Sequence, residues 1–320
     1  MSDTWVIVLA GGDGSRLHAL TTTESGVPVP KQFCSLHGGR SLLHEALERA
    51  RAVASADRVC IVVAAQHRRW WLPALAEVAE ANIIVQPNNR GTANGILLPL
   101  LHIVARDPHA RVVLLPSDHH VQDELVLAES LKRGIRELCG GFEGLLLLGI
   151  SPDDADSDLG YIVPGPARGD ALCPVIRFVE KPDAASARAL IEAGALWNAF
   201  IVMANANTLV QLFARKFPQI VANMQKAVAQ DRDFPGKPDA TQVLYETLPD
   251  IDFSSHVLAD EGSGLSVLQV GHCGWSDIGT PQHLARTLER VPGDAAEPPV
   301  AGMLSLARQH SRMTGGALSR

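Results

Sequence analysis

Apolar, β-branched runs alternate with longer stretches of helical apolar spacing through the first half of the chain. The runs are apolar at nearly every position, which is typical of strands buried on both faces of a parallel sheet, and the stretches between them have the spacing of covering helices. Strands are expected at residues 5–9, 59–64, 83–85, 111–115 and 145–150, and helices at 41–53, 68–79, 92–105 and 124–138. This alternation predicts a Rossmann-like α/β fold with a mostly parallel central sheet flanked by helices.

The second half of the chain is less regular and predicts a mixed-sheet extension of the same sheet. Strands are expected at residues 161–163, 175–179, 200–203 and 266–270, and helices at 184–193, 207–216 and 219–230. From residue 291 the chain is rich in Pro, Gly and Ala, so residues 291–320 are interpreted as a linker and peripheral tail, with one short helix at 303–309. Residues 1–290 form the expected main domain.

Composition narrows the class of protein. The 320 residues are 46% hydrophobic and 20% charged, which suits a large globular core, and the net charge of -7 argues against a nucleic-acid partner. No apolar run approaches the roughly 20 residues that cross a bilayer, and the N-terminus lacks the basic segment of a signal peptide. The five cysteines are scattered without a C-x-x-C pair, as in proteins of a reducing compartment. Together these features predict a cytoplasmic protein.

A glycine-rich loop follows the first expected strand and reads Leu9-Ala10-Gly11-Gly12-Asp13-Gly14-Ser15-Arg16. Glycines after a buried strand let the backbone turn sharply and direct N–H groups at a phosphate chain. The loop has no Gly-Lys-Ser/Thr of a Walker A motif, and Leu17 replaces the third glycine of the dinucleotide-binding pattern, which argues against a dehydrogenase. Arg16, with Lys31 in Pro30-Lys31-Gln32, adds two cations that suit a triphosphate. The alternative is a tight strand-to-helix turn with solvated charges.

Two aspartates come after expected strands of the same sheet. Asp118 follows the strand at 111–115, and Asp277 follows the strand at 266–270. The ends of such strands meet at the ligand crevice, and Mg²⁺ needs only one or two carboxylates beside phosphate oxygens and water. The pair therefore predicts a magnesium site. Taken singly, Asp118 is equally well a helix N-cap, and Asp277 a turn residue that bonds its own backbone.

These motifs occur in the order found in sugar nucleotidyltransferases, and the chain resembles that family up to about Arg286. The glycine loop followed by Pro30-Lys31-Gln32-Phe33 is similar to the family signature, in the form typical of mannose-1-phosphate guanylyltransferases. Other parts resemble its base-binding, metal-binding and sugar-phosphate segments: Gln86 to Ala93, Leu115 to His119, Gly160 to Ile162, Phe178 to Pro182, Trp197-Asn198 and Trp275 to Thr280.

The resemblance implies that residues 1–290 are a catalytic domain that joins GTP to mannose 1-phosphate, with Mg²⁺ as cofactor, to make GDP-mannose and pyrophosphate. It implies catalytic roles for Arg16, Lys31 and Lys181, sugar binding by Gly160, Glu180 and Asn198, and metal binding by Asp118 and Asp277. It assigns nucleotide binding to Leu9, Ala10, Gly11, Gly12, Gly14, Ser15, Gln86, Arg90 and Thr92. The implied partners are small molecules, the nucleoside triphosphate and the sugar 1-phosphate, with no nucleic acid or membrane. A homodimer is left open.

The chain also departs from the family pattern. Asp13 stands where a small residue is common, Gly91 alters the start of the base-side helix, and Asn198 is followed by Ala199-Phe200 instead of Ser-Gly. These departures leave other bases open, with UTP, dTTP or ATP as the nucleotide, and leave the exact sugar open as well. A catalytically silent regulatory subunit that binds nucleotide sugars is the alternative from another class. It is disfavoured because the residues assigned to phosphate and metal are all present.

Overall fold

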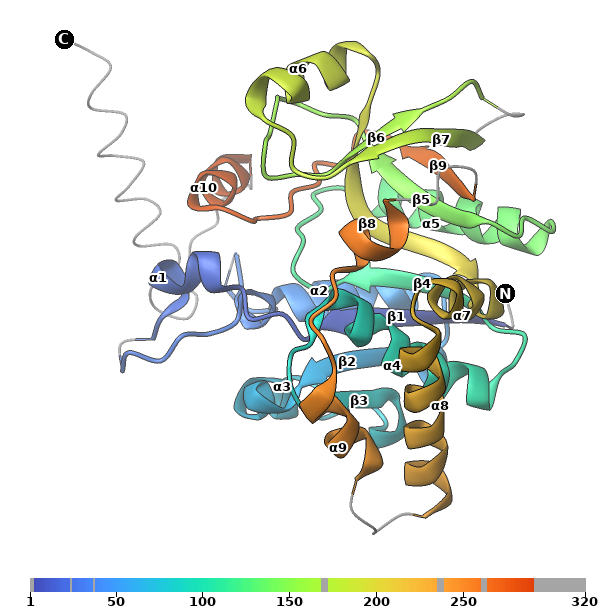
Figure 1. Ribbon diagram of the computed structural model, residues 1–320. Coiled ribbons are helices and arrows are strands. Elements are labelled where there is room, and N and C mark those ends of the chain that lie inside the picture. The colour runs from blue at the N-terminus through green and yellow to red at the C-terminus, as the bar shows by residue number, and fades with distance from the viewer. Residues whose placement is uncertain are drawn as a thin grey trace.

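A nine-stranded mixed sheet forms the centre of the described structure, a computed structural model that describes residues 3–23, 25–36, 38–167, 172–234, 239–259 and 264–290 (Figure 1). The strands are β1 (Thr4–Ala10), β2 (Val59–Ala64), β3 (Ile83–Gln86), β4 (Arg111–Pro116), β5 (Leu145–Ile150), β6 (Tyr161–Pro164), β7 (Leu172–Val179), β8 (Leu196–Asn205) and β9 (Leu265–Val270). Their order across the sheet is β3-β2-β1-β4-β8-β5-β9-β7-β6.

The sheet has a parallel part and a mixed part. Strands β3, β2, β1 and β4 are all parallel, whereas β8 is antiparallel to both β4 and β5. Beyond β8, β5 and β9 are parallel, and β7 and β6 add antiparallel pairs. Strand β6 also pairs with β8, so the pairings of the last five strands close into a ring. This arrangement confirms the expected α/β fold with a mixed extension in the second half.

Helices cover both faces of the sheet, and a separate apolar core lies between the sheet and the helices on each face. One face carries α4 (Gly91–Arg106), α7 (Ala206–Lys216), α8 (Pro218–Asp233), α9 (Ala240–Thr247) and the π-helical turn at Ser254–Leu258, and the other carries α2 (Leu42–Arg51), α3 (Arg68–Ala74), α5 (Glu124–Cys139) and α6 (Ala184–Glu192). A smaller third cluster packs the glycine-loop region with α1 (His18–Thr21) against α10 (Pro281–Arg290). Because α10 follows the turn that carries Asp277, this cluster anchors one wall of the site.

Helix α5 shows how local sequence sets an element. Leu127, Leu131, Ile135 and Leu138 recur every three or four residues and are all buried against the sheet, as helical periodicity requires. Asp123 caps the helix, because its carboxylate accepts the backbone N–H groups of the second and third residues. A capped amphipathic helix of this kind is readable from sequence, and the expected range of 124–138 differs from the observed one by a single residue.

Three further expectations concern the whole chain. Within the residues that the structure describes, no helix is long and apolar enough to cross a membrane. The five cysteines are all free thiols. The expected tail at 291–320, with its helix at 303–309, lies outside the described residues.

Candidate active site

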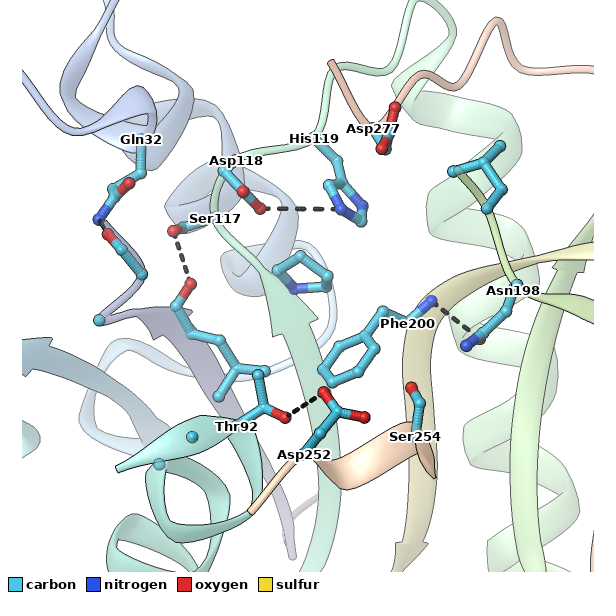
Figure 2. Close-up of a pocket in the computed structure, with 18 of the residues that line it drawn as sticks. Gln32, Thr92, Ser117, Asp118, His119, Asn198, Phe200, Asp252, Ser254 and Asp277 are labelled. Carbon is cyan, nitrogen blue, oxygen red and sulfur yellow. Dashed lines mark hydrogen bonds and ion pairs between the residues drawn. The ribbon is translucent and has the colours of Figure 1, made fainter. Parts of the chain in front are cut away.

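A cavity of about 470 Å³ opens where β1, β3 and β4 end, next to the N-terminus of α4 (Figure 2). This is the edge at which parallel α/β sheets bind ligands, here beside the junction of the β1–β4 pair with the antiparallel β8. The cavity brings together residues from the glycine loop, the base-side segment, the aspartates and the sugar-side segment: Leu9, Gly11, Gly12, Arg16, Gln86, Thr92, Asp118, Gly160, Glu180, Lys181, Asn198 and Asp277. The other residues predicted for the site, Ala10, Gly14, Ser15, Lys31 and Arg90, are not among those that line the cavity.

The glycine loop is held by a side chain that the sequence did not single out for a role. Gln32 donates from Nε2 to the carbonyl oxygens of Ala10, at 3.0 Å, and Gly12, at 2.8 Å. Gly14 has a φ of +63°, and a Cβ there would lie 3.0 Å from the backbone nitrogen of Lys31, so the close approach of the two segments requires glycine. Arg16 extends along the cavity rim, half exposed and 3.8 Å from the carboxylate of Asp158.

Gln86 ends β3 with its carboxamide buried beneath the glycine loop. A Cβ on Gly11 would lie only 2.5 Å from Gln86 Nε2, so the loop passes directly over this side chain. The tyrosine hydroxyl of Tyr245, in α9, is 3.5 Å from Gln86 Oε1. An amide in this position presents both donors and acceptors, which suits the recognition of a base edge.

Arg90 lies beside the cavity but is engaged elsewhere. Its guanidinium donates to the carbonyl oxygens of Tyr245, at 2.9 Å, and Glu246, at 3.0 Å. The side chain therefore joins α9 to the start of α4, and its predicted role at the base stays a prediction.

The segment 249–254 forms the wall opposite the aspartates and was not anticipated from the sequence. Thr92 donates from its hydroxyl to Asp252 Oδ2 at 3.2 Å and accepts the backbone N–H of Phe253 at 2.7 Å. Gly91 makes this contact possible, because a Cβ there would lie 2.3 Å from both Asp250 Oδ1 and the carbonyl oxygen of Ile251. The glycine that departs from the family pattern is thus explained by close packing.

Lys31 ties the two predicted metal ligands together. Its ammonium is 3.0 Å from Asp118 Oδ2, and it donates to the backbone oxygens of Asp277, at 2.6 Å, and Ile278, at 3.3 Å. An ammonium has three N–H donors, so these three acceptors use all of them. In this arrangement the charge of Lys31 serves the aspartates, and its predicted contact with the triphosphate stays a prediction.

The electrostatics keep both aspartates ionised. Burial works to raise the pKa of Asp118, but Lys31 and His119 outweigh it, so that pKa is lowered. Burial also opposes ionisation of Asp277, yet a hydrogen bond from His283, together with the Gly279 N–H, holds its pKa at about 2. Two ionised carboxylates facing one cavity place negative charge there that a cation would balance.

His119 and His283 lie beside the aspartates, and their pKa values shift in opposite directions. Burial lowers the pKa of His119 to about 4, against the attraction of Asp118, and its Nδ1 accepts the indole N–H of Trp275 at 3.3 Å. His283 lies between Asp277 and Asp156, and the hydrogen bond with Asp277 raises its pKa. The surroundings therefore favour the neutral form of His119 beside Asp118 and the protonated form of His283 beside Asp277.

The oxygen atoms left over suit magnesium. Asp277 Oδ1 accepts from Gly279 and His283, whereas its Oδ2 takes no hydrogen bond from the described residues. Asp118 Oδ1 is 3.7 Å from His119 Nε2, beyond hydrogen-bond distance. No group of three or more His, Cys, Asp or Glu side chains arranged for a metal occurs in the described ranges. Two free carboxylate oxygens fit a hard cation that takes its remaining ligands from phosphate and water.

The sugar-side residues converge from three segments. Asn198 donates its backbone N–H to the carbonyl oxygen of Gly160 at 2.8 Å. A Cβ on Gly160 would lie 2.7 Å from Glu180 Oε2, so the glycine leaves room for that carboxylate. Burial raises the pKa of Glu180, although Lys181 opposes the shift. Lys181 is half exposed and has a φ of +45°, which directs its backbone out of the regular strand path.

Several residues of the cavity wall were missed because their signals are weak in a single sequence. Phe200, Asp252, Ser254 and His119 all line the cavity (Figure 2). Asp250-Ile251-Asp252 carries two acids separated by one residue, a pattern that also occurs in ordinary turns. The unusual Ala199-Phe200 pair after Asn198 was the one available signal, and it pointed to the sugar side.

Comparison with known proteins finds relatives that match most of this chain. The chain is 30% identical over 295 residues to a mannose-1-phosphate guanylyltransferase of Salmonella muenchen, and 31% identical over 308 residues to mannose-1-phosphate guanylyltransferase 2 of Escherichia coli O157:H7. These matches cover 88% and 89% of this chain but only 58% and 60% of the two relatives, so the chain spans less than two thirds of their length.

A solved structure and a family model extend the comparison. The fold matches a crystal structure from Thermus thermophilus, described as a mannose-1-phosphate geranyltransferase, with a TM-score of 0.74 and 27% identity, over 91% of this chain and 80% of that one. Residues 5–292 match the family model described as nucleotidyl transferase. The chain belongs to the nucleotidyl transferase family.

Proposed function

We propose that this protein transfers the guanylyl group of GTP to mannose 1-phosphate, forming GDP-mannose and pyrophosphate. A phosphate oxygen of the sugar forms a bond to the α-phosphorus, and the bond from that phosphorus to the bridging oxygen of pyrophosphate breaks. The observation that carries the proposal is the convergence, in one cavity, of a glycine loop, two ionised aspartates and a sugar-side cluster with its own lysine. The choice of GTP and mannose 1-phosphate rests on the two guanylyltransferase relatives.

The residues on the cavity wall would act by position and charge. The attacking phosphate is already ionised, so no general base is needed, and the reaction depends on holding two anions close together in line. Gly11, Gly12 and Arg16 line the cavity and would bind the triphosphate, while Lys181 and Glu180, which also line it, would bind the sugar phosphate. Arg16 is free to turn toward phosphate, because its ion pair with Asp158 is half exposed and contributes little.

Asp118 and Asp277 would hold Mg²⁺ between the two substrate sides. When bound, the ion supplies positive charge that neutralises phosphate oxygens at the reacting phosphorus. Lys31 and His283 keep the two carboxylates in place from behind, so each presents one oxygen to the cavity.

The test of the proposed substrates is a pyrophosphate-release screen. Each of GTP, UTP, dTTP and ATP is combined with mannose 1-phosphate and with glucose 1-phosphate in the presence of Mg²⁺. We expect the highest kcat/KM for GTP with mannose 1-phosphate. Strong turnover with UTP or dTTP and none with GTP would overturn the guanylyl assignment, and binding of GDP-mannose without turnover of any pair would favour a silent regulatory subunit.

The metal assignment has its own test. We expect activity to be lost in EDTA, and Asp118→Asn and Asp277→Asn each to remove most turnover, while the affinity for GTP falls less because the glycine loop is intact. Asp233→Asn, at the exposed end of α8, is the matched control and should be fully active. Activity that persists in EDTA would leave Asp118 and Asp277 with structural roles only.

A further inference from the structure

Phe200 lies on the cavity wall in a backbone conformation that normally belongs to glycine. Its φ is +55°, and it is one of three non-glycine residues with positive φ in the described ranges, the others being Lys181 and Ile278. The left-handed region is unfavourable for any residue that carries a Cβ. Strain of this kind concentrates at functional sites, where surrounding structure holds it.

A bulge in β8 imposes this conformation. Asn198 pairs with Gly149 and Val202 with Leu147, so residues 199–201 of β8 lie opposite Leu148 alone. The backbone N–H of Phe200 leaves the ladder and donates instead to Asn198 Oδ1 at 3.0 Å. The same distortion therefore fixes a predicted sugar ligand and brings an aromatic ring into the cavity.

The ring of Phe200 is supported from behind. It packs edge-on against Phe253, with ring centroids 6.0 Å apart and an interplanar angle of 72°. Phe253 is completely buried and in turn packs on Phe213 at 5.7 Å. The edge-to-face contact between Phe200 and Phe253 is favourable, so it offsets part of the backbone strain and holds the ring at the cavity.

Polar groups surround the cavity side of the ring. Figure 2 shows it between Asn198 on one side and Asp252 with Thr92 on the other, and Glu180 also lines this space. A pyranose has C–H groups on its faces and hydroxyls around its rim. An apolar ring surface with hydrogen-bonding groups on both sides matches a sugar better than it matches a phosphate.

We propose that Phe200 is a specificity-determining residue of the sugar site. Its ring packs against the carbohydrate and occupies space that a bulky substituent, such as an acetamido group, would need. This assignment rests on the proposed function, because it places the sugar of a nucleotide sugar beside Asn198. It goes further because it names the residue that discriminates between sugar substrates, and that residue stands where the resembled family has glycine.

The experiment compares Phe200→Gly, which removes the ring and relieves the backbone strain, with Phe200→Leu, which keeps apolar bulk at the same strained position. Calorimetry gives the affinities of the three proteins for GDP and for GDP-mannose, and thermal unfolding shows that each variant is folded. We expect Phe200→Gly to weaken GDP-mannose binding at least ~10-fold and Phe200→Leu less than about 3-fold, a range typical of apolar pocket contacts. Binding of GDP should stay the same.

Kinetics then test the exclusion of larger sugars. Phe200→Gly should raise kcat/KM for 2-acetamido-2-deoxymannose 1-phosphate relative to mannose 1-phosphate by at least ~10-fold, and Phe200→Leu should not. Equal changes in GDP and GDP-mannose affinity, or no change in either, would overturn the assignment. If the wild-type protein turns over no substrate pair, but Phe200→Gly still weakens GDP-mannose binding, the proposed reaction is refuted and the sugar contact is supported.

Discussion

Replacing Lys31 with methionine tests whether this buried ammonium organises the aspartates. Methionine keeps most of the apolar stem and removes only the charge and its donors. The change leaves the backbone oxygens of Asp277 and Ile278 without their donor, and it leaves Asp118 without its counter-ion. The Lys31 side chain is only 7% exposed, so water can replace few of the hydrogen bonds that its ammonium makes to these backbone oxygens.

The expected cost follows from these contacts. A hydrogen bond from a charged group contributes about 1.5–3 kcal/mol. The Asp118 side chain is 36% exposed, so solvent compensates for part of its lost ion pair. We therefore expect the free energy of unfolding to fall by about 3 kcal/mol in total, and the Tm to fall by roughly 5–10 °C for a domain of this size.

Equilibrium unfolding in urea, monitored by tryptophan fluorescence, measures this change. Lys226→Met, on the exposed face of α8, is the control, and it should stay within about 0.5 kcal/mol of the wild type. If Lys31→Met were no less stable than Lys226→Met, the ammonium would not hold the aspartates. Its role would then have to lie in contact with phosphate.

Three further variants and probes test separate parts of the structure. Gly11→Ala should displace Gln86, because Gln86 Nε2 would lie only 2.5 Å from the new Cβ. The KM for GTP should rise by about 10-fold, with little effect on the KM for the sugar phosphate. Equal KM values for GTP in the wild type and the variant would exclude Gln86 from base binding. Arg16→Ala should fold normally, and its turnover should fall at least ~10²-fold. A fully active Arg16→Ala protein would exclude Arg16 from phosphate stabilisation. A thiol reagent should label the exposed Cys139 quickly, whereas Cys34, whose pKa burial raises to about 12, should react only on unfolding; fast labelling of Cys34 in the native protein would contradict the packing around it.

The strands in the first half of the chain could be predicted from the sequence nearly to the residue. Strand β2 was expected at 59–64 and β5 at 145–150, as observed, because strands buried on both faces are apolar at every position. Strand β8 was expected only at 200–203, yet it runs Leu196–Asn205. Its first half carries Asn198 and the bulge that shape the site, so it lacks the regular apolar pattern that marks a strand.

Helices with mixed composition were harder to predict. Helix α3 was expected to reach residue 79, but it ends at Ala74, directly after Pro73. Helices α9 and α10 were missed. Leu284 and Leu288 of α10 recur at helical spacing, so this helix could have been predicted, whereas α9 has only eight residues and spans about two turns.

Family motifs located most of the cavity wall but not the partners of each side chain. Lys31 is bound to backbone oxygens 246 and 247 residues away, and Arg90 to carbonyl oxygens 155 and 156 residues away. Contacts of such long range depend on how the chain folds back, and no local pattern reports them. The motif identifies which residues are near the site, whereas only the structure shows which of their donors are still available to a ligand.

The central claim is that the bond to the α-phosphorus of GTP is the one exchanged. GTP labelled at its α-phosphate is incubated with mannose 1-phosphate and Mg²⁺, and the products are separated. We expect the label to move into GDP-mannose in an amount equal to the unlabelled pyrophosphate released, and Asp277→Asn to remove most of both products. Label found in GDP together with free orthophosphate, or label that stays in GTP, would contradict the claim.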